Sequence, residues 1–222
     1  MNNNFPTQKN VVTAILEGIK TAKENFLFWT NDRLFLSYGP HKIITLHVAT
    51  QIGKLSNAPE IFIDATVADI LRCSLPDRTL YTQFMSKSNL TQGTFSITLD
   101  ERFKHQNDND SISRVIVSVK NGVRNAKLEY SNEIERICKM LNRATCENST
   151  LDYGVFAFYS DLSNNARKTL DKRVPELVRS FDVVVKKFPT LQSYFVATEI
   201  QKVTDMGEWL AGCYVIEPKS QV

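Results

Sequence analysis

A short apolar run near the middle of the chain constrains the fold most. Residues 153–159 read Tyr-Gly-Val-Phe-Ala-Phe-Tyr and lack the polar residues that alternate along a strand with one exposed face. Such a run is typical of a central strand that is covered on both faces. Helical patterns precede and follow it, and we therefore expect an α/β fold with a mixed β-sheet flanked by helices.

Length and composition indicate a single globular domain. The 222 residues are 42% hydrophobic and 23% charged, which excludes disordered, collagen-like and disulfide-scaffold chains. We expect residues 1–40 to form an N-terminal helical extension and residues 41–222 to form the α/β domain. The start of the chain is polar, and no apolar run of membrane-spanning length follows, which favours a cytoplasmic protein without a membrane partner.

Several segments carry apolar residues at the three- and four-residue spacing of an amphipathic helix. They are residues 11–28, 41–55, 67–71 and 126–141. The stretch 74–92 is polar and irregular, and we expect a surface loop there.

Two alternating segments, residues 93–100 and 113–120, predict a β-hairpin, because Asn107-Asp-Asn-Asp110 between them is typical of a turn. Strict alternation would place Ser96, Asp100, Ser118 and Lys120 on one face. Other strands are expected at residues 60–64, where a short buried strand follows Pro59, and at residues 194–200 and 213–217.

The cysteines and histidines do not predict a metal site. Their positions are Cys73, Cys138, Cys146, Cys213, His41, His47 and His105. None of the cysteines forms a CxxC pair, and four close ligands are needed for structural zinc. We therefore expect reduced cysteines and no metal.

The hairpin, its terminal lysine and the elements after it carry a resemblance. Lys120 ends the second strand, and a helix and a buried strand follow. This skeleton resembles that of the PD-(D/E)XK nucleases, the restriction-endonuclease-like superfamily. Segment likenesses to restriction-endonuclease-like bacterial proteins extend it over roughly residues 40–218. These segments are HKIITLHVA (41–49), IFIDAT (61–66), TFSITL (94–99), RVIVSVKN (114–121) and WLAGCYVIEP (209–218).

The resemblance implies a degenerate active site. It places His41 where the family has a glutamate in its first helix, Ser96 in place of the hairpin aspartate, and Ser118 in place of the glutamate before x-Lys. Only Lys120 is retained. Paired carboxylates hold Mg²⁺ in such sites, and a neutral serine hydroxyl is a weak ligand for this ion. We therefore expect no cofactor.

Acidic residues elsewhere keep an alternative open. Asp100 further along the hairpin and Glu129 on the following helix, with Glu133 and Asp64 as further candidates, are the acids that would have to replace the missing ones. The alternative is then an active Mg²⁺-dependent DNA endonuclease with relocated acids.

The basic residues suggest where a nucleic acid would bind. The chain carries 11 basic and 11 acidic residues up to residue 110, and 16 and 13 after it, for a net charge of +3. Lysine and arginine stripes release counterions from nucleic acid, although a solvated helix face has the same pattern. The candidate contacts are Arg124, Lys127, Arg167, Lys168, Lys172 and Arg173, the last four near one face at helical spacing.

The leading hypothesis is a catalytically degenerate nuclease-like protein that binds double-stranded DNA or a protein partner. A structural or regulatory subunit of a larger complex is a third possibility, and a homodimer is compatible with all three. The resemblance suggests a setting in phage defence or in a mobile element.

Overall fold

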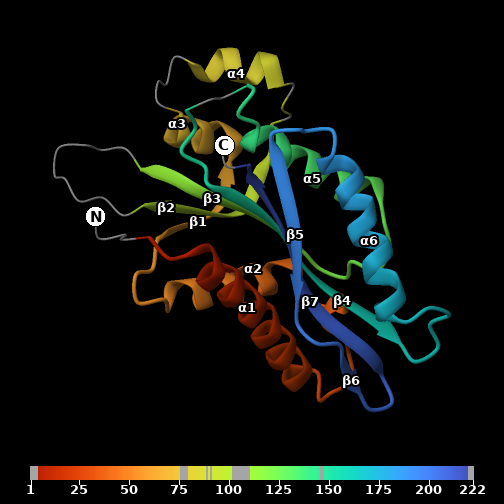
Figure 1. Ribbon diagram of the computed structural model, residues 1–222. Coiled ribbons are helices and arrows are strands. Elements are labelled where there is room, and N and C mark those ends of the chain that lie inside the picture. Colours follow the sequence, from red (N-terminus) through yellow and green to blue (C-terminus); the bar gives the residue numbers. More distant parts are fainter. Residues whose placement is uncertain are drawn as a thin grey trace.

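Residues 5–75, 80–88, 90, 92–101, 111–145 and 148–219 are described by the computed structural model. Within these ranges the chain forms a seven-stranded mixed sheet. Helices lie on both sides of this sheet (Figure 1). The single α/β domain with a mixed sheet is thus as expected. The helices are α1 (Gln8–Trp29), α2 (His41–Gly53), α3 (Val67–Ser74), α4 (Leu80–Ser88), α5 (Leu128–Leu141) and α6 (Leu170–Val185), with a short 3-10 helix at Leu36–Tyr38. The strands are β1 (Glu60–Thr66), β2 (Thr94–Glu101), β3 (Ile112–Lys120), β4 (Tyr153–Ser163), β5 (Leu191–Ala197), β6 (Gln201–Val203) and β7 (Gly207–Pro218).

The strand order in space is β1-β2-β3-β4-β7-β5, and β6 pairs with β7. The first three strands form an antiparallel meander. The β3 and β4 strands are parallel, and α5 is the crossover that connects them. All other pairs involving β4 to β7 are antiparallel. The crossover places α5 directly over the end of β3, where Lys120 lies.

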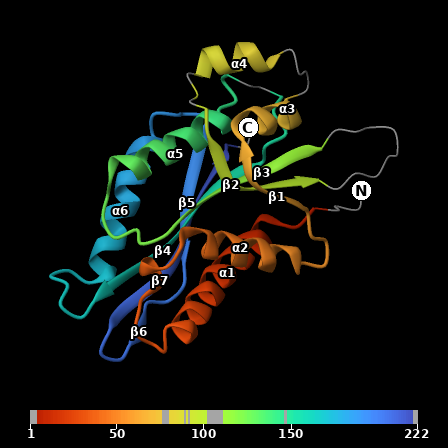
Figure 2. The ribbon, with the colours of Figure 1, turned by 180° about the vertical axis from the view of Figure 1, so that it is seen from behind.

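Helices cover the two faces of the sheet. The apolar stripes of α1 and α2 share a core with one face of β2, β3, β4 and β7. The opposite face packs against α3, α4, α5 and α6 (Figure 2). The strand β4 is buried from Tyr153 to Leu162, which confirms the central strand that its sequence predicted. Residues of α1 belong to the same core as those of α2.

Two glycines allow helices to approach closely. A Cβ atom on Gly18 of α1 would lie 2.5 Å from the Val48 Cα of α2. A Cβ atom on Gly154 of β4 would lie 2.4 Å from the Ile137 Cγ2 of α5. A methyl group at either place would push the two elements apart, because protein interiors are close-packed.

Some elements differ from the predicted ones. Residues 80–88 form α4 within the stretch expected to be a loop, because Phe84 is buried against the core. The strand β1 lies at the edge of the sheet and exposes Phe62 and Ile63, so it is not the buried strand expected there. Asp64 within it has a left-handed φ of 57°. The last strand is longer than predicted, since β7 begins at Gly207.

None of the helices in the described ranges has the length and apolar character that crossing a membrane requires.

Candidate functional site

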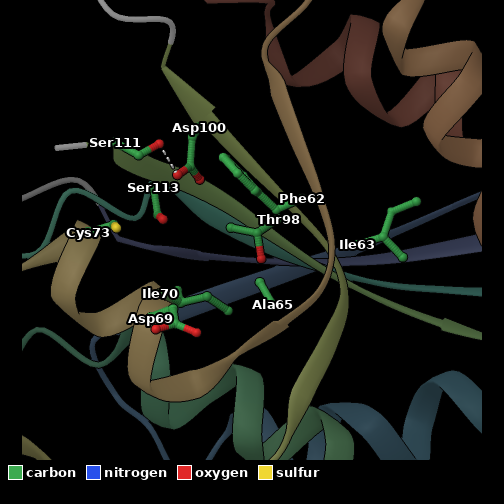
Figure 3. Close-up of a pocket in the computed structure, with 10 residues that line it drawn as sticks. All are labelled: Phe62, Ile63, Ala65, Asp69, Ile70, Cys73, Thr98, Asp100, Ser111 and Ser113. Atoms are coloured by element: carbon green, nitrogen blue, oxygen red, sulfur yellow. Dashed lines mark hydrogen bonds between the residues drawn. The ribbon is translucent and has the colours of Figure 1, made fainter. Parts of the chain in front are cut away.

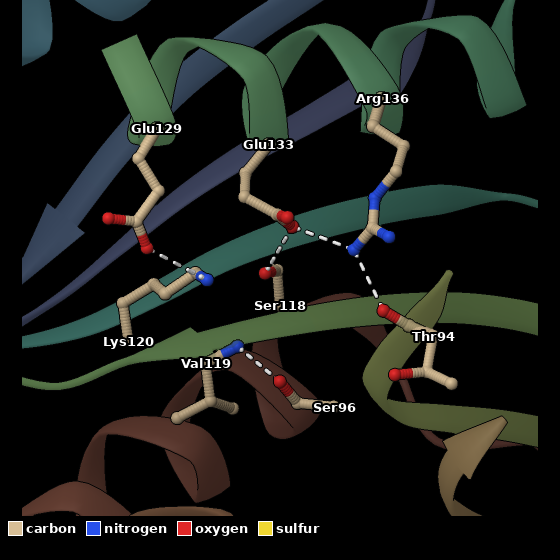
Figure 4. Close-up of polar contacts among 8 residues, drawn as sticks. All are labelled: Thr94, Ser96, Ser118, Val119, Lys120, Glu129, Glu133 and Arg136. Carbon is tan, nitrogen blue, oxygen red and sulfur yellow. Dashed lines mark hydrogen bonds and ion pairs between the residues drawn. The ribbon is translucent and has the colours of Figure 1, made fainter. Parts of the chain in front are cut away.

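Polar side chains from β3 and α5 meet where the two elements face each other. We name Ser118, Lys120, Glu129, Glu133 and Arg136 the β3–α5 cluster (Figure 4). Successive side chains of a strand point to opposite faces, so Ser118 and Lys120 both face α5, as their spacing predicted. The four-residue spacing of Glu129 and Glu133 places both carboxylates on one side of the helix.

Ser118 is buried, with 2% of its surface exposed. Its hydroxyl donates to Glu133 Oε2 at 2.8 Å. The side chain of Ser118 is therefore shielded from solvent. The cause is α5, which packs over this part of β3.

The Glu133 carboxylate also binds a cation. Arg136, one turn along α5, donates to the same Oε2 atom at 2.8 Å and to the Thr94 carbonyl oxygen at 2.8 Å. Its guanidinium lies 4.2 Å from the centre of the Phe95 ring. The arginine therefore compensates the charge of the acid that lies nearest to Ser118.

Lys120 lies at the more exposed end of the cluster. Its Nζ is 3.4 Å from Glu129 Oε1, and 62% of the Glu129 side chain is exposed. Glu129 lies in the first turn of α5, where a negative charge interacts favourably with the helix dipole. The lysine thus has a carboxylate beside it, but a largely solvated one.

Ser96 does not project from the sheet face with Ser118. Its hydroxyl accepts a hydrogen bond from the Val119 backbone N–H at 2.9 Å, as Figure 4 shows. The predicted alternation fails at this residue, since Phe95 packs in the core on the α5 side and Ile97 in the core on the α1 side. The serine oxygen is occupied by the backbone.

His41 is the first residue of α2 and lies beside the end of β3. Burial and the charge of Lys120 lower the pKa of its imidazole, while a hydrogen bond to the Val119 backbone acts in the opposite direction. The neighbouring Lys42 pairs with Asp64. The structure therefore brings His41, Ser96 and Lys120 together around Val119, which joins Ser118 to Lys120. His47 lies elsewhere on α2 and contacts Asn25, and His105 lies outside the described residues.

Asp100 does not join the cluster. It lies at the other end of the hairpin, next to a bulge that follows Leu99, and accepts a hydrogen bond from the Ser111 hydroxyl. Burial raises the pKa of its carboxyl group, against the lowering effect of the Ser111 and Ser113 hydroxyls. Asp100 is therefore not positioned to supply the relocated acid that the endonuclease alternative requires at this cluster.

The basic residues gather from two segments. Arg173 of α6 donates to the Asn125 side chain, which brings the start of α6 beside residues 121–127. Arg167 and Lys168 precede the helix, so the four basic residues do not lie on one helix face as predicted. Lys168 pairs with Glu176 at 3.0 Å.

Arg124 has a structural partner. Its guanidinium bonds the fully buried Asp161 carboxylate and the Ser37 hydroxyl, the latter at 2.8 Å. Lys127, Arg167 and Lys172 are exposed. Asp161 and Arg136 were missed by sequence reasoning. The three-residue spacing of Glu133 and Arg136 was a signal for the second, whereas nothing local in the sequence indicated the first.

The donor set of the β3–α5 cluster does not fit Mg²⁺. This ion requires near-octahedral oxygen coordination in which carboxylates carry the charge. Ser118 offers a neutral hydroxyl, and the Glu133 oxygen is shared with Arg136. Over the part of the chain that the structure describes, no group of three or more His, Cys, Asp or Glu side chains is arranged to hold a metal ion.

Comparison with known proteins gives no relative: no family model, no curated protein and no solved structure matches this chain.

Proposed function

We propose that this chain is a catalytically inactive relative of the PD-(D/E)XK nucleases that acts as a module binding double-stranded DNA. The topology around β3 supports the relationship. A β2–β3 hairpin ends at Lys120, α5 crosses over, and β4 returns parallel to β3 in the buried centre of the sheet. These are the elements on which the resemblance was based.

The hydrogen bond from Ser118 to Glu133 carries the proposal of inactivity. A serine stands where the family pattern has a glutamate, and the nearest carboxylate, that of Glu133, already accepts hydrogen bonds from this hydroxyl and from Arg136. A metal at this place would have to displace Arg136 from Glu133 and leave its guanidinium without a counter-charge. Separating a largely buried ion pair is costly.

The basic residues beside the cluster support DNA as the ligand. Lys127 on one segment and Arg167 and Lys172 on the other are exposed, and the Arg173–Asn125 contact joins the two segments. Lys120, the last residue of β3, directly precedes residues 121–127. Cations spread over a surface of this kind neutralise successive phosphates and release their counterions.

A cleavage assay tests the loss of activity. Supercoiled plasmid is incubated with the full chain and Mg²⁺ or Mn²⁺, and the Lys120→Ala variant, purified in the same way, reveals contaminating nucleases. We expect no cleavage above the level of that variant. Cutting by the natural chain that disappears in Lys120→Ala and in Glu133→Gln would establish the alternative, an active endonuclease with a relocated acid.

A binding assay tests whether the chain binds double-stranded DNA. Fluorescence anisotropy of a labelled duplex is measured over a range of salt concentrations. We expect the logarithm of the affinity to fall with the logarithm of the salt concentration, with a slope of about 0.9 for each phosphate contact. The Arg167→Gln, Lys172→Gln double variant should show a smaller slope. Lys9→Gln with Lys54→Gln, the same loss of charge on α1 and after α2, is the matched control.

An absence of duplex binding at low salt, or an equal loss in the control variant, would overturn the DNA proposal. The module would then belong to the class that binds a protein partner.

A further inference from the structure

A cavity of about 320 Å³ lies between α3 and the β1–β2–β3 edge of the sheet (Figure 3). Its volume is within the range of small-molecule sites. Phe62, Ile63 and Ala65 of β1 and Ile70 of α3 form apolar walls. The cavity is separate from the β3–α5 cluster, because its β2 and β3 residues lie at the other end of the hairpin.

Two buried oxygens in this lining lack partners. Thr98 is 1% exposed and Asp100 is 2% exposed. Within the described residues, no hydrogen bond of normal geometry reaches Thr98 Oγ1 or Asp100 Oδ1, although the Ser113 hydroxyl lies close enough to Asp100 to lower its pKa. Asp100 Oδ2 differs, since it accepts from the Ser111 hydroxyl. Buried polar groups in folded proteins are nearly always paired, so two unpaired oxygens in one cavity require an explanation.

The other carboxylate of the lining is already engaged. Asp69 Oδ2 accepts a hydrogen bond from the Thr66 hydroxyl, and Asp69 Oδ1 pairs with Arg72 at 3.4 Å. Asp100 is therefore the lining carboxylate with an oxygen left over. Burial raises the pKa of this carboxyl group, as expected for a buried acid that lacks a cationic partner.

We propose that this cavity binds a small organic cation, with an amidine or primary amine donating to Asp100 Oδ1 and Thr98 Oγ1 and an apolar body against Phe62 and Ile70. Two unpaired acceptors that line one cavity suit a group with at least two N–H donors. A cationic donor forms the stronger, charge-assisted hydrogen bond to a carboxylate. The inference does not depend on the proposed DNA binding, because none of these residues belongs to the β3–α5 cluster or to the basic segments.

Benzamidine is a suitable probe, since it combines an amidinium with a flat apolar ring. Binding to the full chain is measured by isothermal titration calorimetry near neutral pH. Benzoate, of similar shape and opposite charge, is the matched ligand control. We expect benzamidine to bind and benzoate not to bind. Asp100→Asn should weaken benzamidine by about tenfold or more, because a charge-assisted bond becomes a neutral one. Thr98→Val, of nearly equal volume, should weaken it several-fold.

A third variant acts through the shape of the cavity. Ala65→Leu fills part of the space without altering either oxygen, and it should abolish binding. Thermal melting shows whether each variant is folded. If Asp100→Asn does not fold, Ala65→Leu and Thr98→Val still test the proposal. Equal benzamidine affinity in the natural chain and all folded variants would overturn the proposal. So would an absence of binding at roughly millimolar concentration, the weak limit of a specific small-ligand site.

Discussion

Ser118 and Glu133 are joined by a hydrogen bond of 2.8 Å between the serine Oγ and the glutamate Oε2, across the contact between β3 and α5. The two residues are 15 positions apart, and the crossover that makes β4 parallel to β3 brings them together. The same glutamate oxygen holds Arg136. The Glu133 carboxylate on α5 thus connects Ser118 of β3 with Arg136, one turn further along the same helix.

This linkage predicts an asymmetry between its members. Ser118→Ala removes one neutral donor and should lower the free energy of unfolding by about 1 kcal/mol. Glu133→Ala leaves the largely buried Arg136 guanidinium without its carboxylate and should cost about 3 kcal/mol. Urea unfolding measures both. Equal effects of the two substitutions would contradict the view that Glu133 mainly compensates Arg136.

Arg124 should behave as a structural residue. Asp161 is fully buried, and its Oδ2 has no hydrogen-bond partner among the described residues. Removing the guanidinium in Arg124→Ala leaves that carboxylate uncompensated, at an expected cost of about 3–5 kcal/mol of unfolding free energy. Lys127→Ala, three residues on and exposed, serves as the control and should change the unfolding free energy by less than about 0.5 kcal/mol. A destabilisation by Arg124→Ala no larger than that of the control would show that the pair contributes little.

The titration of His41 should report the charge of Lys120. Burial and that charge both lower the pKa of the imidazole, so Lys120→Ala should raise it toward the ordinary value. Titration of the imidazole signals by NMR measures the change. Lys54→Ala is the control, because Lys54 acts on His47 instead. An unchanged His41 pKa in Lys120→Ala would contradict the proximity of the two side chains.

The same shift gives a pH dependence of stability. A lowered pKa means that the unfolded chain binds the proton more readily than the folded one. The contribution of His41 to stability is therefore complete above its unfolded pKa of about 6.5 and is lost as the pH falls below it. The difference in urea midpoint between pH 7.5 and pH 5.5, each value being about one unit from the unfolded pKa, should be smaller in His41→Gln. An identical difference in that variant would refute this contribution.

Two thiols should resist labelling. Burial raises the pKa of the Cys138 thiol to about 12 and raises that of Cys213 further. Since the thiolate is the reactive form, iodoacetamide should modify neither residue in the native protein and both after unfolding in denaturant. Peptide mass spectrometry identifies the labelled positions. Rapid native labelling of Cys213 would show that β7 opens readily.

The parts of the fold that follow from local pattern were predictable. The uninterrupted apolar run of residues 153–159 predicted the central strand β4. The alternation of residues 113–120 predicted that Ser118 and Lys120 share one face of the sheet, which α5 covers. The helix α4 was missed because it is short, at nine residues, and lies in a polar stretch. Its buried side is shown by Phe84, Tyr81 and Met85, which pack against the core. Burial of that kind is a tertiary property.

The sequence predicted which residues meet at the candidate site better than it predicted the hydrogen bonds that they form. His41, Ser96 and Lys120 do gather around Val119, yet Ser96 bonds the backbone instead of facing α5. A strict period of two cannot anticipate that Phe95 and Ile97 enter different cores. Asp161, which fixes Arg124, lies 37 residues from it in sequence, and no spacing rule connects residues so far apart.

The left-handed Asp64 has a consequence for how copies of this chain meet. An edge strand with regular backbone and exposed apolar side chains, such as Phe62 and Ile63, can pair with a strand of another chain. Repeated addition of this kind extends a sheet into a fibre. At Asp64 the backbone turns away from extended geometry, and the pair with Lys42 sets charges beside the break. A strand from a second copy could therefore pair with only a few consecutive backbone groups of β1. The conformation of this one residue thus opposes edge-to-edge aggregation of the protein.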